Sequence, residues 1–237
     1  MLKTKGAIAI IGPTGVGKTS VAFALARQLG NGEVINLDKI YLFKHFPISS
    51  GLSDTLKEKD VKKHLYELLE PDEDIIDPIK YSEMVIDKCL EIIKSGGVPI
   101  IEGGSTTYFS DFYRLNRQMK VCKIIGLKFP SNFDIEKKIS QRVELAFKEG
   151  LLEEIAQNLK KYRDTLVMQD GHAVVPLVSY LDKEIDFETA KQKILERCLR
   201  YINRQMELFT GYKDIIWIEH ESKLLAQTIE KIIDLVK

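Results

Sequence analysis

Residues 6–30 read GAIAIIGPTGVGKTSVAFALARQLG. A short apolar run leads into a glycine-rich turn, and apolar residues at helical spacing then continue to Gly30. This pattern predicts a buried strand over residues 6–11 and a helix over residues 18–29. The turn between them fits G-x-x-x-x-G-K-[ST], a loop whose glycines let backbone N–H groups converge on a phosphate. The stretch therefore predicts a phosphate site between a strand and a helix.

The residues of this turn have separate expected tasks. Lys18 is expected to reach terminal phosphate oxygens, and the Thr19 hydroxyl is placed to bind Mg²⁺. The helix that follows adds its dipole and its free N–H groups. The motif predicts a polyphosphate ligand. It does not distinguish a nucleoside triphosphate from a compound that carries a diphosphate. The diphosphate-binding residues predicted from the turn are Gly12, Gly15, Gly17, Lys18 and Thr19.

Further apolar runs predict strands over residues 33–37, 98–101, 121–129 and 215–218. Helices are predicted over residues 58–69 and 80–95, and from a cap at Ser105 to about Tyr113. Continuous apolar strands separated by helices favour a parallel sheet that is covered on both faces. The predicted fold is an α/β, P-loop NTPase-like, doubly wound parallel sheet. Its core spans residues 1–130, and residues 131–237 form a mainly helical substrate-binding annex, with 215–218 returning to the sheet.

Composition narrows the function classes. The 237 residues carry 35 basic and 35 acidic side chains, which argues against a surface built throughout for phosphate backbones. A local basic patch remains compatible with this balance. The three cysteines show no CxxC pattern, as in a reduced cytosolic protein, and the four histidines show no zinc-type spacing. The apolar run near the N-terminus is too short to span a membrane. We expect a soluble, cytoplasmic protein, with a monomer favoured.

Polar residues follow the predicted strands at the edge where a parallel sheet binds its ligands. Asp38 ends the second strand, where a carboxylate can act as a general base. Glu102-Gly-Gly-Ser-Thr106 ends the third strand, and its glycines permit close approach of a ligand to the backbone. Ser49-Ser50-Gly51 follows Asp38 at loop distance and adds a hydroxyl group.

Together these segments resemble the isopentenyltransferase family, which includes tRNA dimethylallyltransferases and the adenylate dimethylallyltransferases of cytokinin synthesis. The resemblance is carried by GPTGVGKT from residue 12, INLDK from residue 35 and IIEGGSTTY from residue 100. Ser50-Gly51 matches the bacterial adenylate enzymes. Weaker matches continue the resemblance through Arg142-Val143, GLLEE from residue 150, Asp170-Gly171 and Arg204-Gln205.

The resemblance implies transfer of a dimethylallyl group from dimethylallyl diphosphate to N6 of adenine. Asp38 would take the proton of the amine, which is a poor nucleophile. Lys18, the loop amides, Thr14, Arg142 and Mg²⁺ on Thr19 would stabilise the charge on the departing diphosphate. The residues implied for the adenine nucleotide are Asp38, Ser50, Gly103, Gly104, Ser105 and Thr106. Those implied for the prenyl side are Asp170, Leu199 and Ile202.

Departures from the family pattern bear on the acceptor. His172 stands where the family often has Tyr, and Lys62-Lys63-His64-Leu65 replaces the Pro-His-His-Leu that is usual in tRNA enzymes. Between Tyr108 and Arg142 there is no room for the helical domain that many tRNA enzymes insert. Shortness, neutral charge and Ser50-Gly51 favour AMP as the acceptor, with tRNA as the alternative. A small-molecule P-loop kinase and a nucleotide-binding regulator without catalytic activity are the competing classes.

Overall fold

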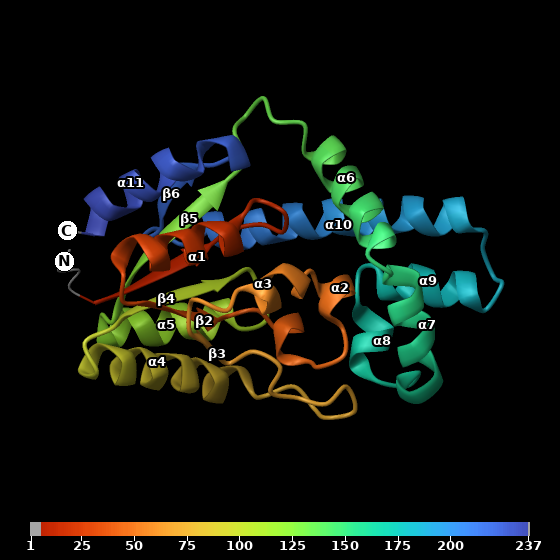
Figure 1. Cartoon of the computed structure of the whole chain (residues 1–237), viewed down its shortest axis with the longest axis horizontal. Coiled ribbons are helices and arrows are strands. Elements are labelled where there is room, and N and C mark those ends of the chain that lie inside the picture. Colours follow the sequence, from red (N-terminus) through yellow and green to blue (C-terminus); the bar gives the residue numbers. More distant parts are fainter. Residues whose placement is uncertain (1–5, 237) are drawn as a thin grey trace.

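The computed structural model describes residues 6–236, except the side chain of Asp54, around a six-stranded sheet (Figure 1). Every neighbouring pair of strands is parallel, and their order is β3-β2-β4-β1-β5-β6. The strands are β1 Ala7–Ile11, β2 Gly32–Asn36, β3 Lys63–His64, β4 Val98–Gly103, β5 Cys122–Lys128 and β6 Ile216–Glu219. The predicted doubly wound parallel sheet is confirmed.

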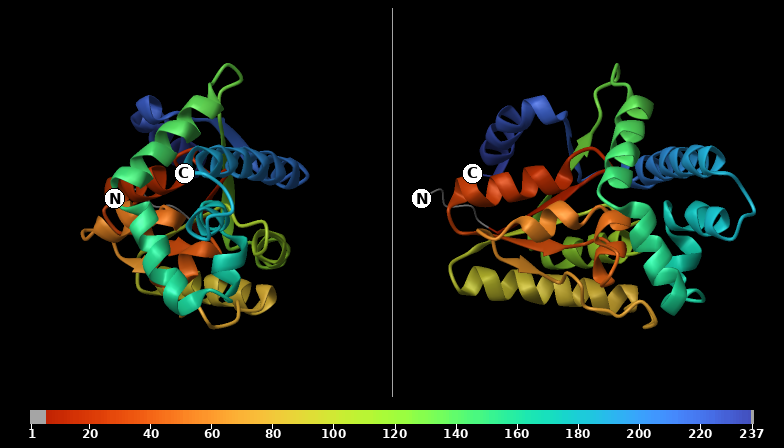
Figure 2. Two further views of the ribbon diagram at one scale, coloured as in Figure 1. Left: turned by 90° about the vertical axis from the view of Figure 1, so that its right-hand side faces the viewer. Right: turned by 45° about the vertical axis from the view of Figure 1, so that its right-hand side comes forward.

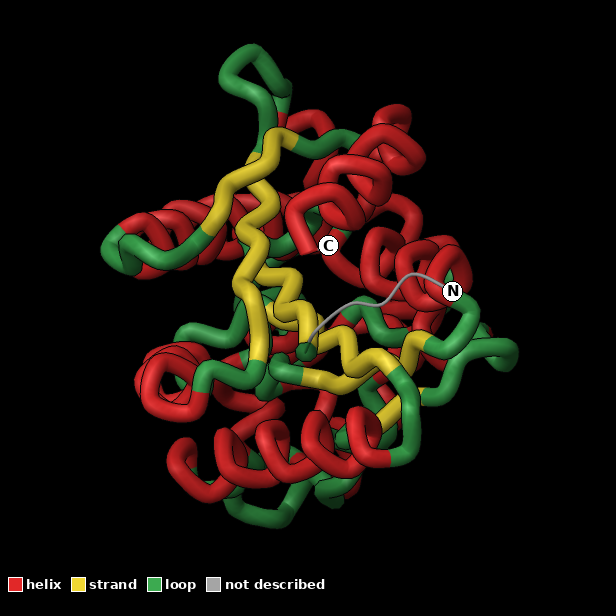
Figure 3. The backbone as a smooth tube through the Cα atoms, turned by 90° about the vertical axis from the view of Figure 1, so that its left-hand side faces the viewer, coloured by secondary structure: helices red, strands yellow, loops and turns green. Residues whose placement is uncertain are grey.

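Helices cover both faces because the central strand β1 is apolar on both sides. Successive side chains of a strand point to opposite faces. Ala9 and Ile11 therefore enter one core, and Ile8 and Ile10 enter the other. The tube view shows the strands between two helical layers (Figure 3). Helices α4 Pro78–Lys94 and α5 Phe109–Met119 pack on the first core, and α1 Lys18–Leu29 and α11 Leu225–Val236 on the second.

The helices between residues 135 and 186 lie beyond the carboxyl ends of the strands, on the right of the molecule in Figure 1. The long helix α10 leads from this part back to the sheet, as both views of Figure 2 also show. The predicted core begins with residues 1–5 and the predicted annex ends with residue 237. These residues lie outside the part of the chain that the structure describes. The elements of the helical part are α6 Ile135–Lys148, α7 Leu151–Tyr162, α8 Leu166–Asp170, α9 Val174–Leu181 and α10 Phe187–Thr210. Shorter elements are η1 Ile40–Leu42, α2 Pro47–Ser50, α3 Ser53–Lys57 and η2 Ser222–Leu224.

The prediction of a helix over residues 58–69 is wrong. Lys63 and His64 form β3 and pair with β2, and the Leu69 N–H donates to the Leu42 carbonyl over 2.8 Å. Leu65 and Glu67 have φ angles of 63° and 50°, which a right-handed helix does not contain. Tertiary pairing with β2 and with the loop after it thus determines the backbone of this segment, overriding its local pattern.

The helix after β4 also begins later than predicted. Ser105 Oγ accepts hydrogen bonds from the N–H groups of Thr107 and Tyr108, at 3.2 and 3.3 Å. Ser105 therefore stabilises a turn, and α5 starts only at Phe109 and continues to Met119. The turn extends the chain between strand and helix, which leaves the Glu102–Thr106 segment at the carboxyl edge of the sheet.

The cysteines Cys89, Cys122 and Cys198 are free thiols, as predicted from their spacing. Among the described residues, no helix is long and apolar enough to cross a membrane.

Candidate active site

The phosphate loop of residues 12–19 connects β1 to α1 at the carboxyl edge of the sheet. Gly12 has a φ angle of 149°, and a Cβ atom there would overlap the Leu127 carbonyl oxygen of β5. Only glycine fits this approach. Lys18 Nζ donates to the Pro13 carbonyl over 3.2 Å, so the ammonium lies across the loop. The N–H groups at the start of α1 are the donors that a diphosphate would use.

Glu102, at the end of β4, is the buried acid of the site. Its Oε2 accepts the Thr19 hydroxyl at 3.1 Å, and its Oε1 accepts the Tyr66 hydroxyl at 3.0 Å. Tyr66 follows β3, which the sequence did not reveal, so nothing in its pattern marked it as a site residue. Thr19 is thus held in place by a carboxylate, at the position where the loop would meet a metal ion.

Asp38 follows β2 and faces the turn after β4. Its Oδ2 accepts the Gly104 N–H at 3.2 Å. The Asn36 side chain fixes the backbone beneath it, because Oδ1 accepts the Asp38 N–H at 2.7 Å and Nδ2 donates to the Asp38 carbonyl at 3.0 Å. Asp38 follows β2, Glu102 lies in β4 and Lys18 follows the loop after β1, so the carboxyl ends of three adjacent parallel strands bring them to one edge of the sheet.

Burial and mutual charge set the protonation of these three groups. Burial raises the pKa values of Asp38 and Glu102, and the Lys18 ammonium opposes both shifts. Burial lowers the pKa of Lys18, and the carboxylates of Asp38 and Glu102 oppose that shift. Each charge thus stabilises its opposite at this partly buried site. A carboxylate with a raised pKa is suited to accept a proton.

Gln205 of α10 joins the phosphate loop to the turn after β4. Its Oε1 accepts the Thr14 N–H at 2.8 Å, and its Nε2 donates to the Gly104 carbonyl at 2.6 Å. The side chain is fully buried. Because the Thr14 N–H is already bonded, only the Thr14 hydroxyl remains for a ligand. The family resemblance included Arg204-Gln205, but nothing in the sequence predicted that Gln205 bonds to both the phosphate loop and the turn after β4.

Replacing Gln205 with leucine is expected to weaken the phosphate loop. Two buried backbone groups would lose their partners, at a cost of about 1–3 kcal/mol each. The melting temperature should fall and the affinity for inorganic diphosphate should drop, as followed by calorimetry. Gln192→Leu, at an exposed position of the same helix, is the matched control. Unchanged diphosphate affinity in Gln205→Leu would show that the bridge does not position the loop.

The Ser50 segment is anchored from the helical part. Glu154 accepts the N–H groups of Ile48 and Ser49 at 2.7 and 2.9 Å. These two bonds give a role to Glu154, the last residue of the GLLEE segment. The sequence analysis matched this segment to the family without assigning a role to it. Arg142 lies against Gly51, where a Cβ atom would overlap its guanidinium. The Ser50 hydroxyl bonds within its own turn, accepting the Leu52 N–H at 3.2 Å.

The residues predicted for the prenyl side differ in their exposure to solvent. Asp170 pairs with Lys39 at 3.0 Å, and its side chain is 63% exposed. Ile202 is buried in the core, whereas Leu199 is half-buried. The rings of His172 and Tyr201 lie 4.4 Å apart, and Tyr201 bonds to Thr106 of the turn after β4. Burial lowers the pKa of His172 to about 4, so this side chain is neutral near pH 7.

The donor set fits Mg²⁺. This ion binds through one or two protein oxygens together with substrate phosphates. The Thr19 hydroxyl and the Glu102 carboxylate provide such oxygens beside the loop. Among the side chains that the structure describes, no cluster of three or more His, Cys, Asp or Glu residues could hold a metal ion.

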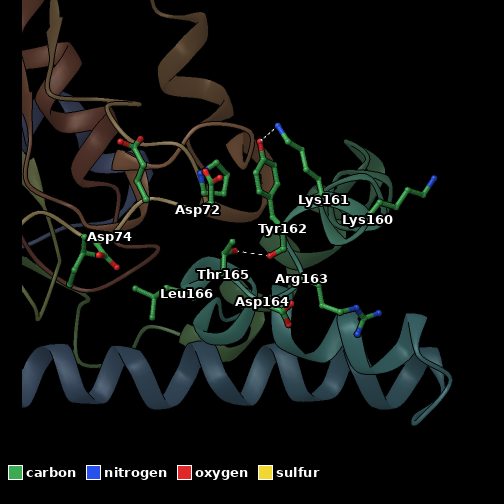
Figure 4. A pocket seen from close by; sticks show the side chains of 12 residues that line it. Asp72, Asp74, Lys160, Lys161, Tyr162, Arg163, Asp164, Thr165 and Leu166 are labelled. Carbon is green, nitrogen blue, oxygen red and sulfur yellow. Dashed lines mark hydrogen bonds between the residues drawn. The ribbon is translucent and has the colours of Figure 1, made fainter.

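A cavity of about 550 Å³ lies elsewhere, between residues 71–75 and residues 160–166 (Figure 4). Two of its three basic side chains, those of Lys161 and Arg163, are engaged. Lys161 donates to the Tyr162 hydroxyl at 2.7 Å, and Arg163 forms two bonds to Asp182. None of its lining residues belongs to the phosphate loop or to the strand ends beside it, so this cavity is separate from the candidate site.

The phosphate loop, the acid on the neighbouring strand and the sheet order define a P-loop α/β protein. Within that class the chain belongs to the isopentenyl transferase family, whose model matches residues 5–211. A tRNA dimethylallyltransferase of Halothermothrix orenii is 22% identical over 284 residues, covering 89% of this chain and 86% of that protein. One of a Thermoanaerobacter species is 24% identical over 287 residues, covering 89% and 90%.

Solved structures share the fold. A tRNA isopentenylpyrophosphate transferase of Bacillus halodurans has a TM-score of 0.83 at 20% identity, covering 98% of this chain and 95% of that chain. The corresponding enzyme of Staphylococcus epidermidis has a TM-score of 0.85 at 19% identity, covering 97% and 98%. The predicted family and the P-loop fold are thus confirmed, and the finer assignment to the cytokinin-synthase type is not shown.

Proposed function

We propose that this protein transfers the dimethylallyl group of dimethylallyl diphosphate to N6 of an adenosine in tRNA. The observation that carries the proposal is the hydrogen bond between Asp38 and the Gly104 N–H, which holds a half-buried carboxylate beside the phosphate loop. A base and a leaving-group site then lie at the same edge of the sheet. Membership of the isopentenyl transferase family supports this reaction over a kinase or a regulator without catalytic activity.

In the proposed reaction the bond between the allylic carbon and the diphosphate oxygen breaks, and a bond from that carbon to N6 forms. Asp38 accepts the proton that N6 releases. Lys18, the Thr14 hydroxyl, Arg142 and the backbone N–H groups of Gly15, Gly17 and Lys18 stabilise the charge on the departing diphosphate. Thr19 would hold Mg²⁺, which would supply positive charge to neutralise part of that developing charge.

We assign the acceptor to the turn after β4 and to the Ser50 segment. Gly103, Gly104, Ser105 and Thr106 present backbone and hydroxyl groups next to Asp38, where the adenine must lie to lose its proton. Asp170, Leu199 and Ile202 remain proposed for the prenyl side.

The choice of tRNA corrects the preference for AMP that shortness and neutral charge favoured. The curated relatives are tRNA dimethylallyltransferases over nearly their full length, which supports tRNA better than AMP. One observation, the shortness of the chain, keeps AMP as a second candidate. The alignment to the Halothermothrix orenii enzyme, a tRNA enzyme, spans 284 positions, so that enzyme carries roughly seventy residues without a counterpart in this chain.

A direct assay tests the proposal. The protein is incubated with dimethylallyl diphosphate, Mg²⁺ and either an unmodified tRNA transcript or AMP, and N6-dimethylallyladenine is measured by mass spectrometry. We expect product in tRNA. Product in AMP alone would overturn the tRNA acceptor, and transfer of the γ-phosphate of ATP to a small molecule, without prenylation, would overturn the whole proposal.

The pH dependence of the reaction should reflect Asp38. Burial raises the pKa of this carboxyl group, and only its ionised form can accept the proton of N6. Activity should therefore be full above the raised pKa and fall as the pH drops through it. We expect the acidic limb of kcat/KM to lie at higher pH than the ordinary pKa of an aspartate. A limb at or below that ordinary pKa would contradict the role of Asp38.

A further inference from the structure

One face of α10 carries four basic residues. Lys193, Arg197, Arg200 and Arg204 are spaced by four, three and four positions, which places them along one side of a helix. We call this face the basic stripe. At 1.5 Å per residue it is about 16 Å long. Lys193, Arg200 and Arg204 are exposed, and Arg197 is half-buried. The buried face of α10 lies to the side, at Ala190, Ile194, Ile202, Gln205 and Phe209.

The basic stripe begins at the candidate active site. Arg204 immediately precedes Gln205, which contacts the phosphate loop. Arg197 Nη2 donates to the Asp170 carbonyl at 3.1 Å, and the Asp170 carboxylate pairs with Lys39, the residue after Asp38. From Arg204 toward Lys193, which is against the chain direction, α10 extends away from the sheet into the helical part (Figures 1 and 2). A polymer whose base reaches Asp38 would thus have this helix beside it.

The charges of the stripe are largely available. Lys193 and Arg204 form no ion pair with any side chain that the structure describes, and Arg200 has only Glu196, at 3.7 Å. Acidic Glu196 and Glu207 lie on the same helix next to the stripe. By contrast, Arg163, which follows α7, is neutralised by two bonds to Asp182, at 2.8 and 2.7 Å. Free guanidinium and ammonium groups are the groups that contact phosphate backbones.

Resting on the proposed tRNA acceptor, we propose that the basic stripe binds the phosphate backbone of the RNA next to the adenosine that is modified. The chain as a whole is neutral, so RNA affinity requires a local concentration of positive charge. The roughly seventy residues that the Halothermothrix orenii enzyme has in addition are not available here. The basic stripe lies on the shared core and can supply this affinity without them.

The test uses the full-length protein and a synthetic RNA stem-loop of the anticodon-arm type, labelled for fluorescence anisotropy. The variant Lys193→Gln/Arg200→Gln/Arg204→Gln removes three charges and leaves Arg197 on Asp170. We expect the Kd for RNA to rise about tenfold or more at moderate salt. The slope of log K against log salt should become shallower by about 2–3, because three phosphate contacts are lost.

Two controls separate charge from structure. Lys94→Gln/Lys231→Gln removes exposed charges from α4 and α11, away from the site, and should leave RNA binding unchanged. The melting temperature and the affinity for inorganic diphosphate should be the same in the stripe variant and the wild type. RNA binding by the wild type with an unchanged Kd and slope in the stripe variant would overturn this inference alone. No RNA binding or modification by the wild type would overturn the proposed tRNA acceptor as well.

Discussion

Replacing Asp38 with asparagine is expected to lower the rate of dimethylallyl transfer by about 10²–10⁴-fold, the usual contribution of a positioned general base. The amide oxygen of asparagine can still accept the Gly104 N–H, so the local backbone should be retained. Asparagine cannot accept the proton of N6. The loss should therefore appear in kcat, measured under saturating donor and acceptor.

Binding of the donor separates this role from a structural one. Asp38 does not belong to the phosphate loop, so inorganic diphosphate should bind the Asp38→Asn protein at least as well as the wild type. Removal of a negative charge near the loop can only favour an anion. Asp182→Asn, which alters an exposed aspartate paired with Arg163, should leave transfer unchanged. Full activity in Asp38→Asn would remove the proposed base.

The sheet was predictable from the sequence because its strands are short, apolar and separated by clear stop signals. The helix over residues 18–29 has the predicted bounds, and the predicted strands at 33–37 and 121–129 differ by one residue at each end from β2 and β5. The glycine-rich turn has a local mechanism, since Gly12 must approach β5 closely. Local chemistry of this kind is encoded within a few residues and needs no knowledge of distant segments.

The parts that escaped prediction depend on distant partners. Tyr66 reaches Glu102 only because residues 63–64 add a strand to β2, and that pairing has no signature within the segment itself. Gln205 bonds to Thr14, 191 residues earlier in the chain, and Glu154 holds a turn more than 100 residues away. Such bonds are set by tertiary packing, which no periodicity records. The roles proposed for Ser50 and Asp170 rest on the family resemblance and stay predictions.

The second large effect is expected for Lys18→Met, which should reduce both donor affinity and turnover. Loss of one hydrogen-bond donor at a developing anion typically costs about 10²–10³-fold in kcat. The Lys18 ammonium also interacts with the carboxylates of Asp38 and Glu102, and it opposes the rise in their pKa values that burial causes. Without it, both carboxyl groups should bind protons more readily, which would inactivate part of the base as well.

This second consequence makes the Lys18 prediction distinctive. In Lys18→Met the acidic limb of the remaining activity should move to higher pH, because the positive charge that favours ionised Asp38 is gone. Lys18→Arg keeps the charge but not the compact ammonium, so it should retain the pH profile while losing part of the turnover. A Lys18→Met protein with wild-type affinity for diphosphate would show that the lysine does not contact the donor. An unshifted acidic limb would show that Lys18 does not influence the catalytic carboxylate, and the coupling of base and leaving-group site through this residue would be rejected.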